Sequence, residues 1–218
     1  MAKLRDNGLT IVLMLLFLAS ITGHLFSGWQ FENEELARHG EPAIGLLRFA
    51  RDPHFLSTVF ENWESEFLQM AAYVVLTACL VQRGSAESRD PDEPPRDKDL
   101  AEQGRKRGAP AMLRAGAAWR WIYAHSLGIT LFLLFAATFV LHWWFSAKEA
   151  ADEALAHGEA PATTVEHLAS AQLWFESFQN WQSEFLSTAV LVVLSIWLRQ
   201  KESPESKAVA APDGQTGT

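Results

Sequence analysis

The sequence NWESEFLQMAAYVVLTACLV occupies residues 62–81, and NWQSEFLSTAVLVVLSIWL occupies residues 180–198. In each copy a polar phrase runs directly into an apolar segment. A helix needs about 20 mostly apolar residues to cross a bilayer core, and both apolar segments are shorter than that. We therefore expect the polar phrase to form the outer turns of each spanning helix. Thr58 and Glu61 form a possible capping pair, which predicts a start near residue 58 for the first copy.

Two further apolar runs, at residues 9–26 and 121–145, are long enough to span a bilayer without added polar turns. The first follows two basic residues, Lys3 and Arg5, as a signal peptide would. No small-x-small cleavage site comes after it, and an equivalent run recurs in mid-chain. The first run is therefore expected to remain as a membrane helix.

The chain aligns with itself without a gap after a shift of 118 positions, so that His24 is aligned with His142. The HGE triplets at residues 39–41 and 157–159 coincide, as do the two Asn-Trp-x-Ser-Glu-Phe-Leu phrases. Each half then contains two spans, so both halves enter the bilayer with the same orientation. The sequence predicts an all-α, four-span transmembrane helical bundle made of two tandem helical-hairpin repeats.

The predicted segments are a first hairpin at residues 1–85 and a second at residues 119–203. A linker at residues 86–118 and a tail at residues 204–218 are rich in charge, Pro and Gly, and are expected to be disordered. Fourteen of the 18 Lys and Arg residues lie before the first apolar run, between Arg83 and Arg120, or after the last apolar run, and four lie in the outer loops. The positive-inside rule therefore predicts that both termini are cytoplasmic. The outer loops contain two helix-forming runs that end in Gly40 and Gly158.

Helical rise places the ionisable residues of the spans at one depth, near the outer face. The predicted polar ring consists of His24, Asn62, Glu66, His142, Asn180 and Glu184. Trp63 and Trp181 are expected to anchor the helices at the membrane interface. Ionisable groups inside a span usually face the bundle interior and find partners there.

Three readings of this ring remain open. In the first, Glu66–His24 and Glu184–His142 pairs hold the helices together in a structural or partner-binding module. In the second, the same pairs carry protons or a solute in a small transporter or proton-coupled channel. In the third, His24 and His142 bind haem, or join Glu66 and Glu184 around a divalent metal. The first reading implies no cofactor.

Several classes of protein are disfavoured. The net charge of −8 argues against nucleic-acid binding, and the chain contains no Gly-x-Ser-x-Gly, His-Glu-x-x-His or phosphate-loop motif, so an enzyme is not expected. The only cysteine, Cys79, cannot form an internal disulfide. The expected partners are the lipid bilayer and either another protein or a second copy of the chain.

The duplicated phrase, with FENWESEFLQM at residues 60–70 and NGLTIVLMLLFLASITGH at residues 7–24, resembles a family of uncharacterised bacterial multi-pass membrane proteins, a domain of unknown function. The resemblance covers residues 7–82 and 125–199. It implies four spans in the bacterial inner membrane and no particular activity. The second copy differs at Gln182 and Ser187, where the first has Glu64 and Gln69.

Overall fold

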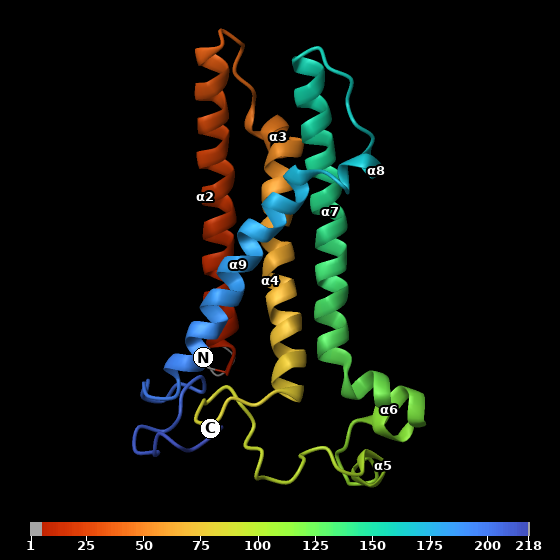
Figure 1. Ribbon diagram of the computed structural model, residues 1–218, viewed down its shortest axis with the longest axis vertical. Coiled ribbons are helices and arrows are strands. Elements are labelled where there is room, and N and C mark those ends of the chain that lie inside the picture. Colours follow the sequence, from red (N-terminus) through yellow and green to blue (C-terminus); the bar gives the residue numbers. More distant parts are fainter. Residues whose placement is uncertain (1–5, 218) are drawn as a thin grey trace. The chain divides into compact units, whose positions relative to one another are not determined.

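The computed structural model describes residues 6–217, and every regular element in that range is a helix (Figure 1). The all-α prediction is therefore confirmed for this part of the chain. The basic residues Lys3 and Arg5 lie outside it. The elements are α2 (Gly8–Arg38), α3 (Leu46–Phe49), α4 (Pro53–Cys79), α5 (Leu100–Gln103), η1 (Ala111–Arg114), α6 (Ala117–Ala124), α7 (Ser126–Ala156), α8 (Thr164–His167) and α9 (Ala171–Leu194).

Helices α2 and α7 are long and apolar enough to cross a membrane. Each has 31 residues, which corresponds to a length of about 46 Å at 1.5 Å per residue. In the most apolar stretch of α2 no side chain is buried, and in that of α7 only 17% of the residues are. The apolar side chains of both helices thus lie on the surface of the chain, where lipid tails would solvate them. That α4 and α9 also span the membrane stays a prediction, as do the predicted domain boundaries.

The polar phrases are helical in both copies, as the sequence predicts, because α4 and α9 contain them whole. The predicted start of α4 near residue 58 is wrong. The helix begins at Pro53, and the Asp52 carboxylate accepts a hydrogen bond from the His54 amide at 3.0 Å. Proline favours the first helical position because its missing amide hydrogen is not needed there. The second copy starts in the same way, with the Ser170 hydroxyl accepting from the Leu173 amide at 3.2 Å.

The outer helical runs are continuous with α2 and α7, and both end as predicted at glycine. Gly40 and Gly158 have positive φ angles of 74° and 72°, a conformation that glycine adopts without steric strain. In both copies the amide after the glycine donates to a carbonyl five residues earlier, at 2.8 Å. These bonds satisfy carbonyls that the end of a helix leaves free.

The chain divides into two compact units. The first comprises Met1–Val59 and His142–His167, and it contains α2, α3, the first turns of α4, the end of α7, and α8. Its core includes Phe49, which is 2% exposed, and Phe55, with ring centroids 5.1 Å apart. The Phe49 ring lies so close to α2 that a Cβ atom at Gly28 would be 3.0 Å from it.

The second unit comprises Phe60–Leu141 and Leu168–Thr218, and it contains the rest of α4, most of α7, and α9. Helix α7 approaches α4 where Gly128 faces Val75, because a Cβ atom there would lie 3.6 Å from the valine side chain. It approaches α9 where the Phe135 ring lies edge-on to the Trp181 ring at 6.3 Å. Three helices therefore pack together within this unit.

Candidate functional site

In the second unit, the polar phrases of α4 and α9 contact each other directly. The Trp181 indole Nε1 donates to Glu64 Oε1 at 2.9 Å, and the Asn180 side-chain amide donates to Glu61 Oε1. Glu64 is completely buried. A buried hydrogen-bonding group is costly to leave without its partner, so this contact holds the two helices in register.

A third polar contact lies further along the same pair of helices. The Gln69 side-chain amide donates to the Thr188 hydroxyl at 2.5 Å. The three contacts form what we call the α4–α9 polar interface, which consists of Glu61, Glu64, Gln69, Asn180, Trp181 and Thr188. Within a span such contacts replace hydrogen bonds to water that the bilayer cannot supply.

Aromatic rings surround the outer part of this interface. Trp181 has edge contacts with Trp174 at 6.3 Å and Phe178 at 5.3 Å on its own helix. Phe139 of α7 adds a tilted contact with Trp174 at 6.1 Å. Edge-to-face aromatic pairs fix the angle between rings, so the indole N–H of Trp181 is held where Glu64 accepts it.

The predicted ring is only partly buried. Asn62 and Glu66 are exposed, whereas Asn180 and Glu184 are intermediate. The expectation that Asn62 and Glu66 are buried is wrong, because the buried carboxylate of this phrase belongs to Glu64. Positions three or four apart share a helix face, so Glu61 and Glu64 lie together on one face of α4, and Asn62 and Glu66 lie together beside it.

The two glutamates that the repeat makes equivalent interact with each other. Glu66 and Glu184 are close enough for electrostatic repulsion between their carboxylates. Trp63, the other predicted interface anchor, packs edge-on against Phe60 at 5.6 Å. Trp181, in contrast, donates a hydrogen bond across the two helices, and the position of both tryptophans at a membrane interface stays a prediction.

In the first unit, His24 lies against the start of α4. Its Nε2 is 3.5 Å from the Thr58 hydroxyl, and its ring lies 5.1 Å from that of Phe55. The Thr58 hydroxyl itself donates to the Phe55 carbonyl at 2.9 Å, so it can accept from a protonated Nε2. The predicted pairs Glu66–His24 and Glu184–His142 stay predictions.

The equivalent residue of the second repeat, His142, is completely buried. One turn later on α7, the Ser146 hydroxyl lies 2.9 Å from Nε2 of His167 in α8, and both residues are buried. The Trp143 indole donates to the Thr164 carbonyl at 2.8 Å. These contacts fasten α8 to the end of α7. Neither Ser146 nor His167 is predictable from the sequence, since single residues at these positions carry no motif.

A histidine–carboxylate pair joins α4 to α7 in the same unit. His54 Nδ1 lies 2.5 Å from Glu149 Oε1. The hydrogen bond to Glu149 raises the pKa of His54, partial burial opposes the rise, and the negative charges of Glu149, Glu32 and Asp52 add to it. The pair therefore favours the charged imidazolium.

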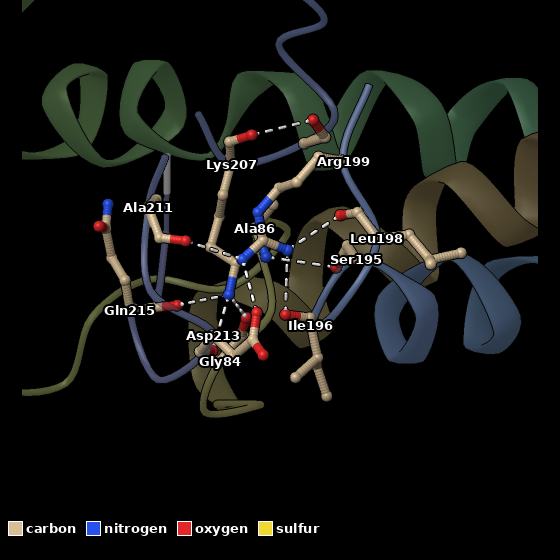
Figure 2. Close-up of polar contacts among 11 residues, drawn as sticks. Gly84, Ala86, Ser195, Ile196, Leu198, Arg199, Lys207, Ala211, Asp213 and Gln215 are labelled. Carbon is tan, nitrogen blue, oxygen red and sulfur yellow. Dashed lines mark hydrogen bonds and ion pairs between the residues drawn. The ribbon is translucent and has the colours of Figure 1, made fainter. Parts of the chain in front are cut away.

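A second polar cluster joins the tail of the chain to the segment after α4 (Figure 2). Lys207 is 1% exposed, and its Nζ donates to the carbonyls of Gly84, Asp213 and Gln215 at 2.6, 2.8 and 3.1 Å. The Arg199 guanidinium bonds to the Asp213 carboxylate at 3.0 Å. Burial lowers the pKa of Lys207, and the nearby Arg199 charge lowers it further, against the opposing effect of Asp213.

Metal binding by the predicted ligands finds no support in this geometry. Within residues 6–217, no three His, Cys, Asp or Glu side chains are grouped as a metal would require. The candidates His24, His142, Glu66 and Glu184 thus form no such group. Cys79 is exposed and free.

Comparison with known proteins identifies a family but no activity. No curated protein and no solved structure matches the chain. One family profile, described as a domain of unknown function (DUF6766), matches residues 1–218. Because the match covers the whole length, the chain belongs to this uncharacterised family, DUF6766.

Proposed function

We propose that the chain is a four-span protein of the bacterial inner membrane, made of two tandem helical hairpins with the same orientation. The helix bounds support the repeat. Helices α2 and α7 start and end 118 residues apart (126 − 8 and 156 − 38), and α3 and α8 do the same (164 − 46 and 167 − 49). Helices α4 and α9 start 118 residues apart (171 − 53). The apolar surfaces of α2 and α7 support the membrane location.

Within this membrane protein, the α4–α9 polar interface holds the two hairpins together. The complete burial of Glu64 beside the Trp181 indole carries this proposal. A carboxylate is expensive to bury in a membrane helix, and it is retained where it has partners. The molecule is then a non-enzymatic structural or partner-binding module, whose partner would be a second protein or a second copy of the chain.

The interface is chemically unequal in its two halves. The repeat pairs Glu61 with Gln179 and Glu64 with Gln182. Each pair keeps the size of the side chain and one accepting oxygen, but only the first copy is acidic. The contacts between α4 and α9 therefore use carboxylates from one hairpin alone.

Cysteine labelling tests the topology. In a Cys79→Ser background, Glu41→Cys and Glu159→Cys occupy equivalent outer positions, and Glu202→Cys occupies the proposed cytoplasmic side. A membrane-impermeant maleimide should label both outer cysteines in spheroplasts, and should label the third only after permeabilisation. Labelling of the two outer positions from opposite sides would rule out hairpins of the same orientation.

Proton-coupled transport is the second candidate, and the repulsion between Glu66 and Glu184 favours it. Two neighbouring carboxylates titrate in separate steps and can share a proton. Liposomes containing the Glu66→Gln, Glu184→Gln double variant distinguish the two candidates. Loss of a wild-type proton flux without loss of thermal stability supports transport. A structural role predicts no wild-type flux above that of empty liposomes.

A further inference from the structure

A cavity of about 420 Å³ lies in the second unit, between the second half of α4 and α9. Its walls are mostly apolar and include Leu76 and Leu80 on one side and Phe185 and Val192 on the other. Ligand sites commonly have volumes of about 300–1,000 Å³, apolar walls and a few polar groups that orient the ligand. The cavity has this character, so the nature of its polar groups decides what it can hold.

Among the polar groups that line the cavity is one strong hydrogen-bond acceptor without a donor. The Tyr73 hydroxyl donates to Glu87 Oε2 at 2.7 Å, and both residues line the cavity. The other carboxylate oxygen, Glu87 Oε1, is buried and receives no hydrogen bond from any residue in the range 6–217. Buried acceptors in native proteins almost always have a donor. Apart from the Glu205 carboxyl group, which lies within hydrogen-bond reach of Glu87, a bound molecule with an N–H group could supply one.

The local charge is negative. Burial raises the pKa of Glu87, the hydrogen bond from Tyr73 opposes the rise, and the charge of Glu205 and a hydrogen bond with its carboxyl group add to it. No Lys, Arg or His is among the described residues that line the cavity. A positive charge in the cavity would therefore relieve the repulsion between the two carboxylates.

We propose that this cavity binds a hydrophobic ammonium compound. The ammonium group donates to Glu87 Oε1, and the apolar body lies against Leu76, Leu80 and Val192. An anion would be repelled by the carboxylates, and a sugar would leave its hydroxyl groups unpaired against the apolar wall. The cavity adjoins the α4–α9 polar interface, since Gln69 and Thr188 also line it, but the proposed ammonium site uses Glu87, which is not part of that interface.

Binding can be measured on the full chain in lipid nanodiscs by titration calorimetry, with empty nanodiscs as the reference. The probes are 4-phenylbutylamine and its neutral analogue 4-phenylbutanol. We expect saturable binding of the amine, about tenfold tighter than that of the alcohol. The Glu87→Gln variant should bind the amine as weakly as the alcohol. Glu93→Gln is the matched control, since this acid lies in the same segment outside the cavity and should change neither affinity.

A second variant keeps the proposal testable if Glu87→Gln does not fold. Val192→Trp fills the cavity with a ring and should abolish saturable binding of both probes. Equal affinities for amine and alcohol in the wild type would point to an apolar occupant such as a lipid chain and would overturn the proposal. Unchanged amine binding in Glu87→Gln, or in Val192→Trp, would also overturn it.

Discussion

The hydrogen bond between Trp181 and Glu64 should make a measurable contribution to stability. Its donor and acceptor lie 2.9 Å apart, and the carboxylate is completely buried. Removing one partner of a buried hydrogen bond costs about 1–3 kcal/mol, because the other partner is left unsatisfied. Polar contacts between membrane helices average about 0.6 kcal/mol and reach about 1.7 kcal/mol. We therefore expect a coupling energy of about 1 kcal/mol.

A double-mutant cycle measures this coupling directly. The variants are Glu64→Ala, Trp181→Phe and the double variant, unfolded by SDS titration in mixed micelles. Trp181→Phe keeps most of the ring and removes the indole N–H, whereas Glu64→Ala removes the acceptor. Glu64→Gln should be milder than Glu64→Ala, since the amide oxygen still accepts and the second repeat already has Gln182 there.

The control is the exposed neighbour Glu66, combined with the same tryptophan variant. Glu66→Ala and Trp181→Phe should be additive within about 0.5 kcal/mol. A coupling energy for Glu64 and Trp181 that is no larger than this control would refute the argument that the contact holds the helices together. A coupling of opposite sign would refute it as well.

Three further predictions follow from individual contacts. Gly28→Ala should be less stable than Gly23→Ala by about 1–3 kcal/mol in the same unfolding assay, because both gain helix propensity but only the first overpacks the Phe49 ring, and a Cβ atom at Gly23 has nothing within 4 Å. Because the pKa of His54 is raised, its pair with Glu149 should stabilise the fold fully below about pH 6.5. That gain should fade as the pH rises through the His54 pKa, and thermal unfolding of His54→Gln should lack this pH dependence. Lys207→Ala should increase hydrogen exchange and proteolysis in residues 211–217.

Each of these has its own control. Equal effects of the two glycine variants would contradict the close approach of Phe49 to α2. The pH-dependent stabilisation of the fold by the His54–Glu149 pair should stay below about 1 kcal/mol, since the pair is partly exposed. Glu149→Gln should remove this stabilisation as fully as His54→Gln does. Lys201, whose side chain is 81% exposed, should tolerate alanine without any change in exchange.

The helices were the predictable part of the fold. Apolar runs and glycine stops are local signals, and they located α2, α7 and the ends at Gly40 and Gly158. The start of α4 was misplaced because Thr58 and Glu61 have a capping spacing, whereas the actual cap at Asp52 is recognised only together with the proline that follows it.

The buried carboxylate was not predictable from the repeat. Self-alignment selects residues that the two copies share, such as Glu66 and Glu184. The contact between α4 and α9 instead joins residues that are not equivalent in the repeat: the Trp181 indole donates a hydrogen bond and the Glu64 carboxyl group accepts it. Lys207 was missed for another reason: its acceptors are backbone carbonyls, which leave no trace in the sequence.

The difference between the glutamates of the first hairpin and the glutamines of the second bears on whether two separate hairpins could form the same contact. Two unlinked copies of the first hairpin would each bring a Glu61 and a Glu64 to the contact, which would then hold four of these carboxyl groups where the fused chain has two. In the fused chain, the first hairpin carries Glu61 and Glu64, and the second hairpin carries their neutral isosteres Gln179 and Gln182. The linker thereby makes possible a pairing that identical, separate chains are unable to form.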